Sequence, residues 1–224
     1  MVARGLAEPR EGGWAFAHAL LQECLSRHAD EEGEGQTLHR ACAQMIRGLE
    51  EKRPGHAARL GRHLLLAGDT FDALPALLEG MREALHRQDT DALGDCIELR
   101  GAALKAAGVP PSHQPHGENL MAKAWYHILC SEWQEAERLA FEGLRGVEAF
   151  GWAGIAPECE QVLGKALFEQ ADYGGAMVHY QAAVQGFREM GDSYSEAVTT
   201  IKFGQVHAAQ GEFQGGAALF RQAV

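Results

Sequence analysis

Metal binding is the first chemistry to consider, because cysteine and histidine recur at helical spacings near the N-terminus. Cys24 and His28 are four residues apart, and His39 and Cys42 are three apart. Each pair would therefore share one face of a helix. A structural zinc site needs four such ligands, and each pair supplies only two. We therefore expect these residues to pack in the core, and we assign no metal.

Phosphate binding and nucleophilic catalysis have little support in the sequence. The stretch "CEQVLGKA" contains Gly164-Lys165, but Cys159 stands where a phosphate loop needs its first glycine, and Ala166 replaces the hydroxyl residue. No G-x-S-x-G motif occurs, and the serines lack a recognisable partner pattern. We expect no catalytic residue and no cofactor in this chain. An unrecognised α-helical hydrolase remains a remote alternative.

The composition narrows the class of protein. Twenty Lys and Arg residues stand against 31 Asp and Glu, a net charge of −11, whereas a nucleic-acid binder needs a basic face. No signal peptide or membrane-length apolar run is visible, and the five cysteines form no C-x-x-C. We expect a cytoplasmic protein with reduced thiols, and no nucleic-acid or membrane partner. Ala, Leu, Glu and Gln are abundant, which favours helices throughout.

The elements that would position any site repeat every 40 residues. Three turns, "CSEWQEA", "QADYGGA" and "QGEFQGG", place Trp133, Tyr173 and Phe213 after an acidic residue. Nine residues before each aromatic lies a small residue; these are Ala124, Gly164 and Gly204. A looser copy, "LAGDTFDAL", follows Gly61. Several independent positions share one period, which indicates a repeat architecture.

Each repeat has a simple physical interpretation. A first helix carries a small residue where its neighbour comes close, a tight turn follows, and a second helix begins with an aromatic wedge. One such hairpin cannot bury its apolar face alone, so successive hairpins stack. We therefore predict an all-α fold, a right-handed α-α superhelix built as a solenoid of antiparallel helix pairs.

The same residues resemble the tetratricopeptide (TPR) family, in its variant of about 40 residues. Leu163-Gly164 and Phe203-Gly204 match the family's L-G positions, and Ala183 and Ala223 match its late alanine. The glycine pairs at 174–175 and 215–216 depart from the pattern and lower helix propensity there. The resemblance covers roughly residues 115–224, and 55–88 loosely. It implies a module that binds a peptide or protein in a concave groove.

The chain divides into five segments. We predict a disordered lead over 1–13, a helical segment over 14–54, loose TPR-like helices over 55–108, and a proline-rich linker over 109–117. The linker carries His113 and His116, a weak metal or pH-sensing pair that we interpret as an exposed loop. TPR repeats follow over 118–224, at about 118–150, 153–190 and 193–224. The last repeat is truncated without a polar capping helix, which suggests a fragment of a longer chain or an end open to self-association.

A second resemblance involves the N-terminal part. It is similar to the region after the nucleotidase of bacterial signalling proteins with a STAND-class ATPase, where a helix closing a winged-helix module leads into TPRs. The matching residues are Phe16, His18, Leu20, Glu23, Leu38-His39, Ala43, His63 and Ala67-Gly68. This resemblance implies an array that docks partners or restrains an ATPase, with a Ser/Thr kinase elsewhere in some members. The alternative function is thus the regulatory part of a multidomain enzyme.

The TPR resemblance also implies which side chains would line the groove. The first helix of each repeat faces inward, so its polar positions are the candidates. Counted from the Leu-Gly pair, the expected partner-binding residues are Trp125, Gln161, Lys165, Phe168, Glu169, Ile201 and Gln205. Met121, Leu129 and Ala209 fall at further inward positions. The expected partner is a protein or peptide, or an ATPase or kinase domain of the same polypeptide.

Overall fold

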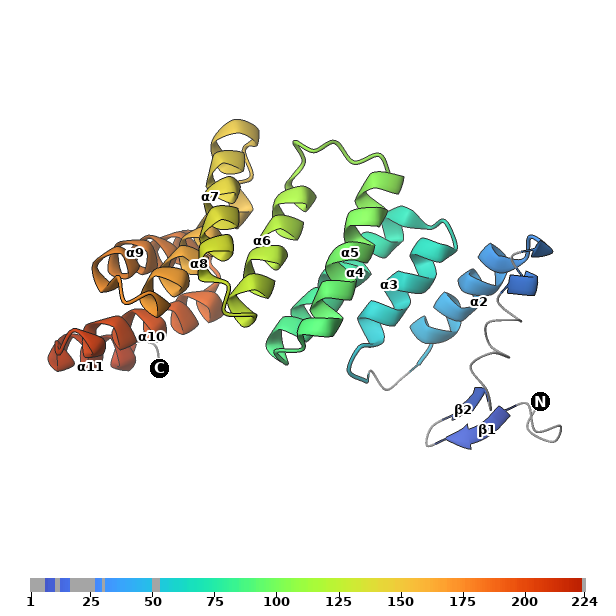
Figure 1. The fold of residues 1–224 in the computed structure, drawn as a ribbon, viewed down its shortest axis with the longest axis horizontal. Helices are drawn as coiled ribbons and strands as arrows, with labels where there is room; N and C mark the ends of the chain where they lie inside the picture. Colours follow the sequence, from blue (N-terminus) through green and yellow to red (C-terminus); the bar gives the residue numbers. More distant parts are fainter. Residues whose placement is uncertain (1–6, 11–12, 17–26, 30, 50–52, 223–224) are drawn as a thin grey trace.

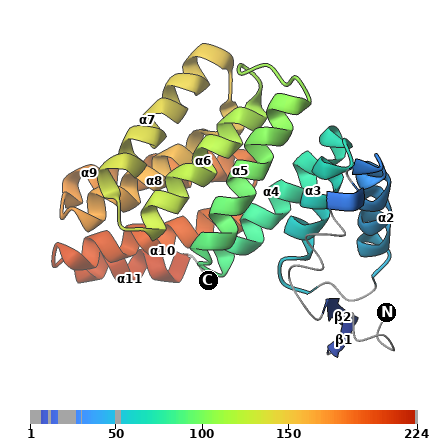
Figure 2. The same cartoon turned by 45° about the vertical axis from the view of Figure 1, so that its right-hand side comes forward.

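A computed structural model describes residues 7–10, 13–16, 27–29, 31–49 and 53–222. The chain forms a row of helices packed side by side, with α2 at one end and α11 at the other (Figures 1 and 2). Short turns join successive helices, so neighbours run antiparallel. The all-α stack of helix pairs predicted from the repeat is confirmed.

The described helices of the stack are α2 Gly35–Arg47, α3 His56–Leu66, α4 Thr70–His86, α5 Thr90–Ala106, α6 Gln114–Leu129, α7 Trp133–Phe150, α8 Ala156–Glu169, α9 Tyr173–Met190, α10 Ser193–Ala209 and α11 Phe213–Gln222. From residue 118 onward, the helix pairs α6–α7, α8–α9 and α10–α11 coincide with the three predicted repeats. A short 3-10 turn, Ala153–Ile155, precedes α8. The predicted aromatics Trp133, Tyr173 and Phe213 are the first residues of α7, α9 and α11.

The repeated turn has one backbone geometry. Ser131, Ala171 and Gly211, 40 residues apart, adopt φ of 61°, 62° and 81° and end the first helix of each pair. The amide of Asp172 then donates to the Leu167 carbonyl at 2.9 Å, which closes a Schellman-type turn. The Asp172 carboxylate accepts from the Gly175 amide at 2.9 Å and caps α9. The acid before each aromatic is thus part of the turn itself.

Small residues let paired helices approach closely. A Cβ atom added at Gly164 would lie 2.9 Å from the ring of Tyr180, which is buried and sixteen residues later. The same sixteen-residue pairing recurs in two other hairpins: Gly61 with Leu77, and Gly204 with Phe220. In the α6–α7 hairpin the corresponding residues are Ala124 and Ala140, both fully buried in one cluster. These contacts confirm the prediction that a small residue of the first helix lies where the second helix comes close.

Two layers run along the stack. In one, α4 contacts α6, α6 contacts α8, and α8 contacts α10. Among the described helices of the other layer, α5, α7, α9 and α11 are spaced more widely than these, so this part of the stack curves toward the even-numbered helices. We call the solvent-facing side of α4, α6, α8 and α10 the inner face. The sequence grouped α3 and α4 as one hairpin with α3 first, and the close approach of Gly61 to Leu77 agrees with that pairing. Because α4 also contacts α6, we include α4 in the inner face, while α3 contacts α5.

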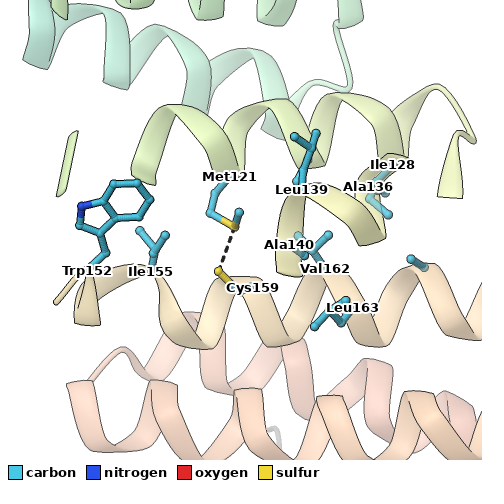
Figure 3. Close-up of a cluster of buried hydrophobic side chains, with 12 residues drawn as sticks. Met121, Ile128, Ala136, Leu139, Ala140, Trp152, Ile155, Cys159, Val162 and Leu163 are labelled. Carbon is cyan, nitrogen blue, oxygen red and sulfur yellow. Dashed lines mark hydrogen bonds between the residues drawn. The ribbon is translucent and has the colours of Figure 1, made fainter. Parts of the chain in front are cut away.

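Trp152 closes the junction between two repeats. Its ring is buried against Gly117 of α6 and Gly146 of α7, and its Nε1 donates to the Ser112 carbonyl at 2.8 Å. Figure 3 shows Trp152 and Ile155 at one end of the core cluster formed by α6, α7 and α8. One indole thus ties the connection before α8 to the connection before α6.

The proline-rich segment is shorter than predicted. The linker was expected to extend to residue 117, but α6 begins at Gln114. Pro115 lies in the first turn of this helix, where a missing N–H costs nothing and the fixed φ suits the helix. His113 flanks the helix start, and the Nε2 atom of His116 lies 3.0 Å from the Val109 carbonyl oxygen. His116 therefore fastens the turn.

The N-terminal segment differs from its prediction. Residues Ala7–Arg10 (β1) and Gly13–Phe16 (β2) form an antiparallel hairpin, in place of a disordered lead and a helix from residue 14. Aromatic residues favour strands, and neither Pro9 nor Gly13 suits a helix interior. Phe16 therefore does not lie in the helix that the STAND resemblance implies. His18, Leu20, Glu23 and Cys24 lie outside the described residues.

We predict that Gly146→Ala destabilises the fold by about 1–3 kcal/mol, because the added methyl would lie 2.1 Å from the Trp152 ring. Urea unfolding of the whole chain measures this change. Gly174→Ala is the matched control, since its nearest neighbour is an Asp172 oxygen at 3.7 Å. The control should be neutral or slightly stabilising. Equal effects of the two changes would show that the ring does not occupy this slot.

Candidate partner-binding face

Equivalent positions of three repeats fall on the inner face. Trp125 of α6, Lys165 of α8 and Gln205 of α10 are 40 residues apart. Trp125 lies between α4 and α8, Lys165 forms an ion pair with Glu169 one turn later, and Gln205 is exposed. These predicted residues thus form one column across three neighbouring helices.

Gln161 and Ile201 occupy the next column along the same helices. The Gln161 side-chain amide donates to the Thr199 hydroxyl of α10 at 2.7 Å, and Thr199 is fully buried. Ile201 is 39% exposed. Gln161 therefore links two inner helices, whereas Ile201 offers apolar surface to solvent.

Other predicted inward positions serve the core instead. Phe168 packs on Tyr173 with ring centroids 5.7 Å apart, at the edge of the cluster around Tyr180. Met121 is fully buried, and its Sδ accepts a hydrogen bond from the Cys159 thiol at 3.3 Å (Figure 3). The absence of a side chain on Gly143 of α7 makes room for Met121. Leu129 packs against the cluster between α4 and α5. The inward positions were counted from the Leu-Gly pair of the repeat, and such a count assigns the same direction to equivalent side chains whatever their neighbours are.

Sequence reasoning missed Arg82, which joins the first column. Gln88 adopts φ of 55° before Asp89 and Thr90, so it matches Ser131, 43 residues later. The same offset aligns Arg82 of α4 with Trp125. The acid-capped turn at Asp89 was the available signal, but its spacing is not 40 and no small residue precedes the acid. The inner-face column therefore runs Arg82, Trp125, Lys165 and Gln205.

A small pocket opens beside this column, between α4, α6 and α8. Its volume is about 90 Å³. Arg82 and Trp125 line this pocket together with two acids, Glu118 and Glu158. The remaining lining residues are apolar: Leu78, Met81, Leu85, Leu93 and Ala122. A larger open hollow of about 390 Å³ lies on the other side of Arg82, over Pro54 and the α4 residues Glu79, Glu83 and His86.

The two acids of the small pocket have different partners. Glu118 accepts from the buried guanidinium of Arg100 at 2.5 Å, and Arg100 also donates to the Pro115 carbonyl at 2.7 Å. Glu158 accepts from Trp125 Nε1 at 2.9 Å, and the described residues provide no ion pair for it. Glu118 is thus neutralised within the fold, and Glu158 is not.

The environment of Glu158 changes its acidity. Burial raises the pKa of its carboxyl group from 4.5 to about 7, and the Glu118 charge adds to this rise. The hydrogen bond from Trp125 and the charge of Arg82 act in the opposite direction. A carboxyl that ionises near neutral pH in a pocket marks a candidate binding site.

The described residues offer no metal cluster, and two of their cysteines are buried. No group of three His, Cys, Asp or Glu side chains that could hold a metal ion occurs among them. His39 contacts His63, with the two Nδ1 atoms 3.0 Å apart. Burial raises the pKa of the Cys96 thiol to about 11 and that of Cys159 to about 12, which leaves both unreactive at neutral pH.

The structure also places the phosphate-loop fragment and shows whether the described helices could span a membrane. Gly164-Lys165 lies inside α8, as expected, where the glycine packs on Tyr180. None of the described helices combines the length and apolar character of a membrane span.

Neither a scan against protein-family models nor a search of curated proteins finds a match to this chain. The inner face therefore provides the basis for a functional proposal.

We predict that Glu158→Gln stabilises the protein by about 1–3 kcal/mol at pH 8 and by much less at pH 4.5. Because the folded-state pKa of Glu158 is raised to about 7, the unfolded chain loses this proton first as pH rises from 4.5. Wild-type stability is therefore lost between pH 4.5 and 7, whereas glutamine keeps the Trp125 hydrogen bond without titrating. Urea unfolding at both pH values measures the difference.

The control for this experiment is Glu148→Gln, which removes an exposed carboxylate from α7. It should change stability alike at the two pH values. A pH-independent effect of Glu158→Gln would contradict the buried, ionising carboxyl.

Proposed function

We propose that this chain is a non-catalytic protein-interaction module of the TPR type, which binds a peptide or protein segment along its inner face. The observation that carries the proposal is the column of Arg82, Trp125, Lys165 and Gln205, which four stacked helices present on one side. Helical stacks of this kind use such extended curved surfaces for binding. The proposed location is the cytoplasm, in a bacterial signalling protein.

The chemistry of the inner face favours a partner with mixed character. One cation, one indole, an ion-paired lysine and an amide follow one another along the column, and Ile201 adds exposed apolar surface. Such a surface suits a peptide or helix that carries apolar anchors between polar residues. The net charge of −11 speaks against nucleic acid as the partner.

An intramolecular partner is the second candidate, and one contact favours it. Two residues of the STAND resemblance, His39 and His63, lie against each other between α2 and α3. The neighbouring Arg40 donates to the Ala67 carbonyl at 2.8 Å and pairs with Asp69 at 2.8 Å. We propose that the stack could restrain an ATPase or kinase domain of a longer protein. Such activity would lie outside this chain.

The test uses peptides selected from a random 12-residue display library against the whole chain. We predict that Ile201→Asp weakens binding of the selected peptides by about tenfold or more, because it places a charge in the apolar part of the inner face. Fluorescence anisotropy measures the dissociation constants.

Val178→Asp is the matched control, since Val178 is 66% exposed on α9 in the other layer. It should leave the affinity within about twofold. Unchanged binding by Ile201→Asp, or equal losses for the two variants, would exclude the part of the inner face around Ile201 as the site and contradict binding along the whole face.

A further inference from the structure

The pocket between α4, α6 and α8 has an unbalanced acid. Glu118 is paired with Arg100 inside the fold, but within the part of the chain that the structure describes the Glu158 carboxyl group receives only the Trp125 indole N–H. Arg82 is near enough to influence Glu158 electrostatically, yet its side chain is 69% exposed and lies 3.8 Å from Glu79. Among the described residues, no cation therefore forms an ion pair with Glu158.

The pocket has the dimensions of one side chain. Its volume of about 90 Å³ corresponds to roughly three water molecules at their volume in the liquid. Leu78, Met81, Leu85, Leu93 and Ala122 form the apolar part of its wall. Long basic side chains bury an apolar stem while their charged end keeps a polar partner. The wall and the acid match the two parts of such a side chain.

We propose that this pocket receives a basic side chain, lysine or arginine, of the bound peptide, with its charged end on the Glu158 carboxylate beside the Trp125 indole. This inference rests on the proposed function and adds the class of residue that the partner must present. The apolar stem lies against α4 and α5, and the cation supplies the missing ion pair. The indole contributes an electron-rich face to the same cation.

The charges of the pocket disfavour other occupants. An anionic group would meet two carboxylates, and the buried Arg100 is already engaged by Glu118. A wholly apolar side chain would cover Glu158 without giving its carboxylate a partner, which is costly for an ionised group. Arg82 is the one exposed cation among the lining residues, so its removal should help a basic occupant and harm an acidic one.

The ionisation of Glu158 makes binding depend on pH. Three charged groups line the pocket: Arg82 from α4, Glu118 from α6 and Glu158 from α8. Arg100 of α5 is buried and pairs with Glu118. A cation binds the deprotonated form of Glu158, whose pKa is about 7 in the free protein. Affinity should therefore rise about tenfold from pH 6 to pH 8.

The test is an NMR titration of the whole chain with n-butylammonium, which mimics the lysine side chain. The Trp125 indole N–H resonance, assigned with Trp125→Phe, should shift saturably. Glu158→Gln should weaken n-butylammonium binding about tenfold or more, and Arg82→Ala should strengthen it about two- to fivefold. Both changes leave the hydrogen bond to Trp125 in place.

Neutral n-butanol and anionic butyrate are the matched probes. An equal response to n-butanol, tighter butyrate binding, or unchanged n-butylammonium affinity in Glu158→Gln would overturn the assignment. The outcome is distinct from that of the peptide experiment. If selected peptides need Ile201 but n-butylammonium does not bind, only the basic side chain is excluded. If n-butylammonium binds while Ile201→Asp changes nothing, the inner-face proposal fails and the pocket assignment stands as a property of the chain.

Discussion

The close approach of two helices at a residue with little or no side chain sets the geometry of the whole stack. At Gly164 the backbone of α8 lies directly against the Tyr180 ring of α9, and the same spacing recurs at Gly61 and Gly204. Such contact leaves no freedom to slide one helix along the other, because packed interiors have few voids. The turn then has a set length, and equivalent residues of successive first helices come to the same side. For α6, α8 and α10 the inner face is a consequence of that register, whereas α4, the second helix of its hairpin, joins this face through its contact with α6.

The sequence predicts this register well because each part of it depends on local chemistry. A left-handed residue, an acidic residue and an aromatic recur together, and they mark where one helix ends and the next begins. The likeness of the α4–α5 turn to the repeated turn was missed because Gln88 adopts positive φ without being small, at a spacing of 43 residues from Ser131. Met121 and Phe168 were expected in the groove, but both pack against the core. For Met121 the reason is the space that Gly143 leaves on the neighbouring helix, which the Met121 side chain fills. Such contacts between residues far apart in the sequence cannot be predicted from the 40-residue repeat.

The pocket arises where the repeat is least regular. The connection between α5 and α6 is longer than the repeated turn, and the Trp152 indole and Arg100 hold it against the stack. Glu118 and Glu158 occupy equivalent positions of α6 and α8, yet only Glu118 has a cation within the fold. At this irregular junction the same repeat position therefore carries Glu118, which is paired, and Glu158, which is available to a partner. Binding function in a repeat protein can reside in such departures as much as in the regular surface.

The central claim is that contact between Gly164 and Tyr180 sets the register, and a double-mutant cycle tests it most directly. Gly164→Ala with Tyr180→Ala recreates the pair that Ala124 and Ala140 form in the preceding hairpin. Urea unfolding should show that Gly164→Ala costs about 1–3 kcal/mol in the wild-type chain. In the Tyr180→Ala background the same change should cost nothing or stabilise slightly. An equal cost in both backgrounds would contradict the account.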